Sequence, residues 1–322
     1  GAMHPRGTRN PHHAGHTPGG SSSGSAAAVA AGMVPLAIGT QTNGSVIRPA
    51  SYCGIVGFKP SFGRVPRTGV LAQCRPLDTV GVFGRTVADA ALIADALAGH
   101  DPGDPDTRLA PPPRLLDTAL TEPPVIPAFA FVKSPVWHLA EESTKDGFAE
   151  LVEALGKACE EVALPEVYGE GAMAQRTLNL AGIARNYGRY AERGAAELSD
   201  FMRGAIADGR KVTAVDYLTA LDWQVSLNAG LDQLFDRYDA ILTPAATGEA
   251  PHGLHATGNP AFCSLWSLCG VPAISLPLLR GPNGLPVGVQ LVGRRGEDAR
   301  LLRTARWLMN AVEQASEGED DA

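Results

Sequence analysis

The chain has 322 residues, of which 44% are hydrophobic and 19% are charged, so it has enough apolar material for a large core and is not a disordered chain. Its net charge of −7 argues against a surface that binds nucleic acid. No apolar run reaches the length of a transmembrane helix, and the first residues lack the apolar segment of a secretory signal. The five cysteines are scattered without a CxxC pair, so we expect reduced thiols in a cytoplasmic protein that binds no metal and no membrane.

The residues at the two ends are predicted to lie outside the domain, because they are polar or acidic and the first three resemble the scar of a cleaved tag. The predicted organisation is as follows: a tag scar and polar segment at 1–18, a single domain at 19–314 with a motif core at 19–98, a helical middle at 140–237 and a C-terminal core at 238–314, and an acidic tail at 315–322.

The spacing of apolar residues along the chain predicts alternating short strands and amphipathic helices. Helices are expected at 25–31, 86–98, 141–163, 171–193, 213–236 and 298–312. Strands are expected at 34–39, 129–133, 240–243, 273–276 and 287–292. Strands near both ends of the chain with helices between them indicate an α/β fold, in which helices cover a mixed β-sheet.

One turn in the motif core carries residues suited to chemistry. Thr42, Asn43 and Gly44 form a turn sequence that can expose consecutive backbone N–H groups, and Ser45 follows directly. A hydroxyl beside unpaired N–H donors suits a nucleophile with an oxyanion hole, although a purely structural turn fits the spacing as well. The Gly/Ser-rich loop at 19–25 supplies further hydroxyls, with a flexible linker as its alternative.

Three features together resemble the amidase signature family of serine hydrolases. They are Ser21 in the Gly/Ser-rich loop, Ser45, which follows 24 residues after Ser21, and the run CGIVGFKPS at 53–61. The resemblance implies an amidase signature fold and hydrolysis of a carbon–nitrogen bond, other than a peptide bond, in a small amide substrate. It implies Ser45 as nucleophile, Ser21 as a bridging serine after a cis peptide bond, and an oxyanion hole formed by the N–H groups of Thr42, Asn43, Gly44 and Ser45. It also implies a homodimer and no cofactor.

Several other residues are candidates for the substrate pocket or for positioning the loops. Many members of the family carry Asp and Gly where this chain has Gln41 and Asn43. Phe262 and Trp266 lie four residues apart on one face of an expected helix, where core packing is the alternative to a pocket wall. The predicted pocket residues are Gln41, Ser22, Phe262 and Trp266. Arg48 is expected to anchor the catalytic loop through hydrogen bonds.

The general base is the member of the site that the sequence does not supply. The resemblance implies a catalytic lysine upstream of the bridging serine, but none of the 20 residues before Ser21 is a lysine. Lys59 falls in the FKP run, which is interpreted as structural. The histidines close to the motifs are weighed as substitute bases or substrate contacts against simple loop residues: His12, His13, His16, His252 and His255.

We therefore expect an N-terminally short form of the family fold, without the layer that carries the lysine. Four interpretations stay open at this point. The chain is an amidase-type hydrolase, an amidase-like binding protein without activity, a trimmed piece of an ordinary amidase, or an acyl-transfer enzyme with a substituted base.

Overall fold

A mixed sheet of eight strands lies at the centre of the computed structural model, which describes residues 7–320. The strand order is β1-β3-β2-β7-β8-β6-β4-β5, with parallel pairing of β4 to β5 and to β6 and antiparallel pairing elsewhere. The strands are β1 (Ala37–Gln41), β2 (Val56–Lys59), β3 (Thr79–Gly84), β4 (Phe129–Phe131), β5 (Cys159–Glu161), β6 (Ala240–Pro244), β7 (Ala273–Arg280) and β8 (Pro286–Val292).

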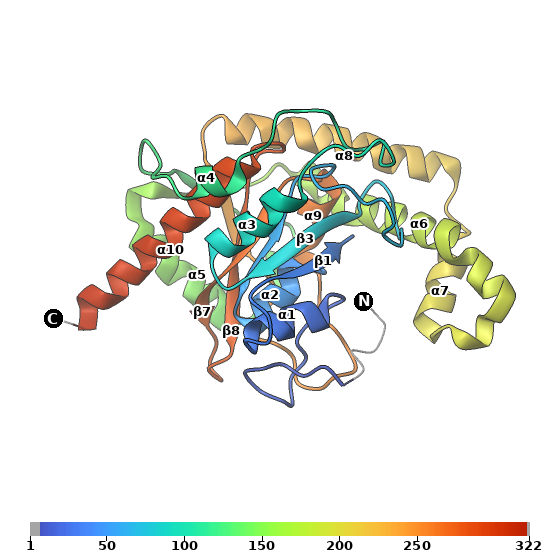
Figure 1. Cartoon of the computed structure of the whole chain (residues 1–322), viewed down its shortest axis with the longest axis horizontal. Helices are drawn as coiled ribbons and strands as arrows, with labels where there is room; N and C mark the ends of the chain where they lie inside the picture. Colours follow the sequence, from blue (N-terminus) through green and yellow to red (C-terminus); the bar gives the residue numbers. More distant parts are fainter. Residues whose placement is uncertain (1–6, 321–322) are drawn as a thin grey trace.

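Helices cover both faces of this sheet. The described helices are α1 (Ser23–Ala30), α2 (Ile47–Cys53), α3 (Val87–Leu97), α4 (Leu115–Ala119), α5 (Glu142–Leu155), α6 (Glu170–Gly194), α7 (Asp200–Gly209), α8 (Ala214–Phe235), α9 (Ala261–Cys269) and α10 (Asp298–Asp320). Figure 1 shows α3 and α10 crossing in front of the sheet, while α6 and α7 extend beyond it at the right of the view. The predicted α/β class, with helices over a mixed sheet, is therefore confirmed.

Apolar side chains of the strands alternate between the two faces of the sheet, so the core consists of two layers. Phe129 and Phe131 of β4 point into the cluster that holds α3, α4, α5 and α10, whereas Ala130 between them joins the cluster with α6, α8 and α9. In β6, Ala240 and Leu242 join the first cluster and Ile241 joins the second. Successive strand side chains point to opposite faces, so strands with apolar residues on both faces are buried between two helical layers.

Several predicted elements are confirmed close to their expected bounds. A capping box formed by Thr86 and Asp89 opens α3, which was expected at 86–98, and a second one, formed by Thr213 and Asp216, opens α8. The long helix α6 matches the expected range of 171–193 to within one residue at each end. The helix that places Phe262 and Trp266 on one face is α9.

Other predictions were wrong in extent. The helix expected at 141–163 ends at Leu155, because Gly156 takes a positive φ of 50° and the chain then forms β5 beside β4. The first strand lies at Ala37–Gln41 rather than 34–39. The last helix continues to Asp320, past the expected end at 312, so it includes part of the expected acidic tail. The expected tag scar lies outside the described residues.

The hairpin of α6 and α7 is held by close approaches at glycine. A Cβ on Gly182 would lie 2.7 Å from the Cβ of Cys74, so α6 packs directly on the loop that precedes β3. A Cβ on Gly209 would lie 2.0 Å from the carbonyl oxygen of Leu180, so the end of α7 touches the backbone of α6. These two contacts fix both helices relative to the β3 end of the sheet, although α7 itself was not predicted from the sequence.

Lys59 at the end of β2 is a buried cation in this core. Its ammonium group donates to the carbonyl oxygens of Val271 at 2.5 Å and Pro60 at 3.1 Å. Burial lowers the pKa of Lys59 to about 7, although Asp298 nearby acts in the opposite direction. The structural role predicted for Lys59 agrees with this position.

We predict that Gly209→Ala lowers the free energy of unfolding by about 1–3 kcal/mol, because the new methyl group overlaps the backbone of α6. The matched control is Gly204→Ala in the same helix, where a Cβ meets no atom within 4 Å. That change should be neutral or stabilise the protein by up to about 1 kcal/mol through helix propensity. Urea denaturation measures both values, and equal effects of the two changes would contradict the close approach.

We also predict that Lys59 makes stability depend on pH. Because the pKa is about 7 in the folded chain and 10.5 as the reference value, the unfolded chain binds more protons between these values. Stability therefore rises with pH in that window, by at most about 1.4 kcal/mol per pH unit. Denaturation from pH 7 to 8.5 should show wild type gaining stability relative to Lys59→Met, while the exposed-site variant Lys157→Met follows wild type. Parallel curves for wild type and Lys59→Met would refute the shift.

Candidate active site

The turn after β1 is built around the side chain of Gln41. Its carbonyl oxygen accepts the N–H groups of Val46 at 2.8 Å and Ile47 at 3.0 Å, at the start of α2. Its amide nitrogen donates to the hydroxyl of Ser267 in α9 at 3.0 Å. The side chain is buried, with both of its ends paired, so Gln41 fixes the direction in which the chain leaves β1 and enters α2.

Four consecutive backbone N–H groups in this turn are left free. Within residues 7–320, the N–H groups of Thr42, Asn43, Gly44 and Ser45 donate to no other group of the chain. Gly44 allows α9 to approach, because a Cβ there would lie 3.0 Å from the Cβ of Pro260. Free N–H groups in a turn are the donors that bind an oxyanion.

Neighbouring side chains hold the turn from two sides. The hydroxyl of Ser264 donates to the Oδ1 of Asn43 at 2.6 Å, and the hydroxyl of Ser267 donates to the carbonyl oxygen of Asn43. On the other side, Thr42 donates to a carboxylate oxygen of Asp78 at 2.6 Å. Burial raises the pKa of Asp78, while the hydrogen bond from Thr42 acts against that rise. Asn43 thus fits the position where many family members carry glycine, and its side chain adds a contact to α9.

Ser21 is placed by a second loop, which Arg48 joins to the first. The peptide bond between Gly20 and Ser21 is cis, as the family resemblance predicts. The buried guanidinium of Arg48 donates to the carbonyl oxygens of Gly20 at 2.6 Å and Gly258 at 2.8 Å, and to the hydroxyl of Thr257 at 3.1 Å. Desolvation lowers the pKa of Arg48. The expected anchoring role of Arg48 is therefore confirmed.

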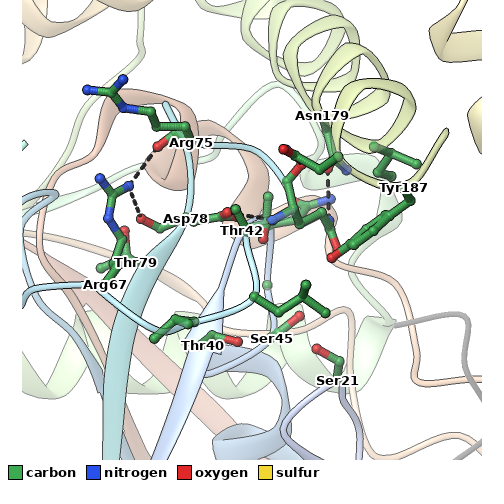
Figure 2. A pocket seen from close by; sticks show the side chains of 18 of the residues that line it. Ser21, Thr40, Thr42, Ser45, Arg67, Arg75, Asp78, Thr79, Asn179 and Tyr187 are labelled. Atoms are coloured by element: carbon green, nitrogen blue, oxygen red, sulfur yellow. Dashed lines mark hydrogen bonds between the residues drawn. The ribbon is translucent and has the colours of Figure 1, made fainter. Parts of the chain in front are cut away.

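Ser21 and Ser45 line one cavity of about 1240 Å³. Figure 2 shows their side chains on the same side of that cavity, below Asn179 and Tyr187 in the view. Within the described part of the chain, neither hydroxyl makes a hydrogen bond, and no hydrogen bond joins the two. The described residues thus bring two unpaired serine hydroxyls and four free N–H donors to one cavity, and a hydroxyl nucleophile beside such donors is part of what acyl transfer requires.

The four residues predicted as pocket lining lie elsewhere. Gln41 is buried under the turn, and Ser22 pairs with the backbone of Thr40 along the free edge of β1. Phe262 and Trp266 are buried to about 1% exposure, because α9 directs their side chains into the core. Core packing, the alternative that the sequence left open for these two aromatic residues, describes their positions.

The cavity wall opposite the serines contains residues that the sequence did not indicate. Arg67 pairs with Asp104 at 2.9 Å and with Asp106, and these contacts hold the loop after β2 against the loop after α3. The hydrogen bond from Arg67 keeps the pKa of Asp104 well below its usual range. Asn179 and Tyr187 of α6 complete the wall (Figure 2). These residues lie far apart in the sequence and share no motif, so only the fold identifies them.

The bases available at the cavity differ from the family pattern. None of the five lysines lines it, and Lys59 points into the core. His255 lies on the lining, whereas His12 bonds to the carbonyl oxygen of Cys53 and His16 to that of Ala250. His13 and His252 both stack edge-on against His16, away from the serines. His255 is therefore the histidine that the described structure brings to the serine cavity.

Residues 7–320 contain neither a metal-binding cluster nor a membrane-spanning helix. No cluster of three or more His, Cys, Asp or Glu side chains there could hold a metal ion. In the same range, every helix is too short or too polar to cross a membrane.

Comparison with known proteins agrees with this geometry. The model of the Amidase family matches residues 5–302. Among curated proteins, a glutamyl-tRNA(Gln) amidotransferase subunit of Thermotoga maritima is 36% identical over 332 residues, covering 93% of this chain and 69% of that protein.

Solved structures of other proteins share the fold of this chain. A protein from a vestigial complex that reveals the origins of an s-triazine catabolic enzyme superposes with a TM-score of 0.85 at 26% identity, over 94% of this chain and 68% of that one. The 6-aminohexanoate cyclic dimer hydrolase superposes with a TM-score of 0.79 at 28% identity, over 94% and 70% of the two chains. With its sequence matched over 5–302 and its fold matched over nearly its whole length, the chain belongs to the amidase family.

Proposed function

We propose that the chain transfers an acyl group from a small amide substrate, with Ser45 as the nucleophile and Ser21 as the bridging serine. The observation that carries this proposal is the row of four free N–H groups that ends at Ser45, in a cavity shared with Ser21. A structural turn has no need to leave four donors unpaired beside an open cavity, because unpaired donors are costly unless water or a ligand satisfies them.

The proposed reaction follows from this arrangement. The hydroxyl oxygen of Ser45 attacks the amide carbon, and the electron pair of the carbonyl moves onto its oxygen. The N–H groups of 42–45 stabilise this oxyanion, and its collapse breaks the carbon–nitrogen bond and releases the amine with a proton. Water then attacks the acyl-enzyme ester and restores Ser45. Ser21 passes the proton between Ser45 and the base.

The reaction also needs a general base, and the cavity lining offers a histidine for this role instead of the family's lysine. His255 is exposed on the lining and carries an imidazole nitrogen that can accept a proton from a serine hydroxyl. The absence of any lysine from this cavity lining favours, as a second candidate, a protein that binds an amide without cleaving it. The same labelling experiment separates the two functions.

The cellular setting is also a proposal. We keep the prediction of a cytoplasmic protein that forms a homodimer. The curated relative is named as one subunit of an amidotransferase, so assembly with a different protein is the alternative. Light scattering of the purified chain, alone and after capture from cell extract, distinguishes the two arrangements.

We predict that a serine-directed fluorophosphonate adds once to the chain, and that intact mass and peptide mapping place the adduct on Ser45. Ser45→Ala should abolish labelling, and Ser21→Ala should slow it by about two to three orders of magnitude, because the proton relay is lost. The control is Ser25→Ala, whose hydroxyl bonds to the carbonyl oxygen of Ile38 away from the cavity.

Two outcomes count against the nucleophile. A folded protein that takes no adduct would support the binding function, and an adduct on another serine would refute the assignment to Ser45. If His255 is the base, His255→Gln should lower the rate at which Ser45 is labelled by about two orders of magnitude, because general-base assistance is lost. An unchanged labelling rate would remove His255 from the mechanism.

A further inference from the structure

Four exposed apolar side chains gather on the lining of the serine cavity. Leu71 is 69% exposed, Phe201 57%, Val70 42% and Tyr190 39%. Val70 and Leu71 come from the loop between β2 and β3, and Tyr190 and Phe201 come from the hairpin of α6 and α7. Large apolar side chains that face solvent inside a cavity indicate a surface that a ligand covers.

The two segments that carry these side chains are held in place. Gly182 brings α6 against Cys74 of the loop, and Gly209 brings α7 against the backbone of α6 at Leu180. The amide of Asn186 also donates to the carbonyl oxygen of Gln73 at 2.9 Å. These contacts fix the loop and the hairpin relative to each other, where both line the cavity of about 1240 Å³.

Charged groups on the same lining are largely paired within the protein. Arg67 is held by Asp104 and Asp106, and Arg75 pairs with Asp106 at 2.9 Å. Asp78 accepts from Thr42 and from two backbone N–H groups. Arg185 is exposed at the boundary with a neighbouring cavity, whose lining it shares. The remaining surface around Leu71 and Phe201 therefore offers a ligand mainly apolar contact.

We propose that the amide substrate carries a large apolar group, such as an aryl or long alkyl group, and that this group binds between Leu71 and Phe201. The inference rests on the proposed function for the position of the amide beside Ser45. The apolar group binds through burial of hydrocarbon surface, which does not require that the bond be cleaved. Leu71 and Phe201 are thus specificity-determining residues for the size of the substrate.

The test measures binding in a chain that cannot react. Calorimetric titration of Ser45→Ala with a series of ω-phenylalkanamides should give dissociation constants at least about tenfold lower than those of the matching alkanamides without the ring. The series also shows which chain length places the ring between the two walls, as the member that binds most tightly.

Variants on each wall then locate the apolar group. Leu71→Ser and Phe201→Ser, made in the Ser45→Ala chain, should each weaken binding of the best phenylalkanamide about three- to tenfold and leave the ring-free amide unchanged. The matched control is Val225→Ser, because Val225 is 71% exposed in α8 and lies off the lining. Circular dichroism confirms that the variants fold.

The outcomes separate this inference from the proposed function. Equal affinity for amides with and without the ring, or equal effects of the wall variants and the control, would overturn the apolar site. Tight binding of phenylalkanamides together with no fluorophosphonate adduct on Ser45 of wild type would retain the apolar site and refute the acyl transfer. Labelling of Ser45 in wild type, together with equal affinity for amides with and without the ring, would retain the acyl transfer and refute the apolar site.

Discussion

The buried side chain of Gln41 is the contact on which the candidate site depends. Its carbonyl oxygen takes the two N–H groups that open α2, and its amide nitrogen reaches α9. The N–H groups of Val46 and Ile47 are thereby satisfied, whereas those of the four residues before them have no partner within residues 7–320, and these four residues line the cavity. Gln41→Ala would leave the buried N–H groups of Val46 and Ile47 without an acceptor, at a cost of about 1–3 kcal/mol each. The turn would then no longer be held in its present conformation.

That contact also explains why a neutral residue can replace the Asp that many family members carry. The role of position 41 in this chain is to accept two N–H groups and to donate one hydrogen bond, and a primary amide does both without charge. A carboxylate would accept the same N–H groups but could not donate to Ser267 unless it were protonated. The neutral side chain therefore couples the turn to α9, and no negative charge is added near the proposed oxyanion.

The parts of the fold that the sequence predicts are those encoded locally. Helix α3 begins at a capping box, and α6 and α8 carry apolar residues at helical spacing, so each follows from a short window. The turn of 42–45 and the two serines follow from a motif. The short strand β5 was missed, because its three residues look like the end of a helix until β4 pairs with them. Phe262 and Trp266 were ambiguous for a similar reason: a helical face does not say whether the core or a substrate pocket lies opposite.

The groups on the cavity lining that have no partner within the described chain indicate the chemistry of the ligand. Most polar groups around the cavity are paired, as Arg67 and Asp78 illustrate, so they form the wall rather than contact points. Among the groups that remain open are the N–H donors beside Ser45 and the hydrocarbon at Leu71 and Phe201. The first calls for an acceptor oxygen and the second for an apolar group. An amide whose carbonyl oxygen meets the turn while its apolar part covers the helical hairpin satisfies both, whereas a small polar amide would leave the hydrocarbon exposed.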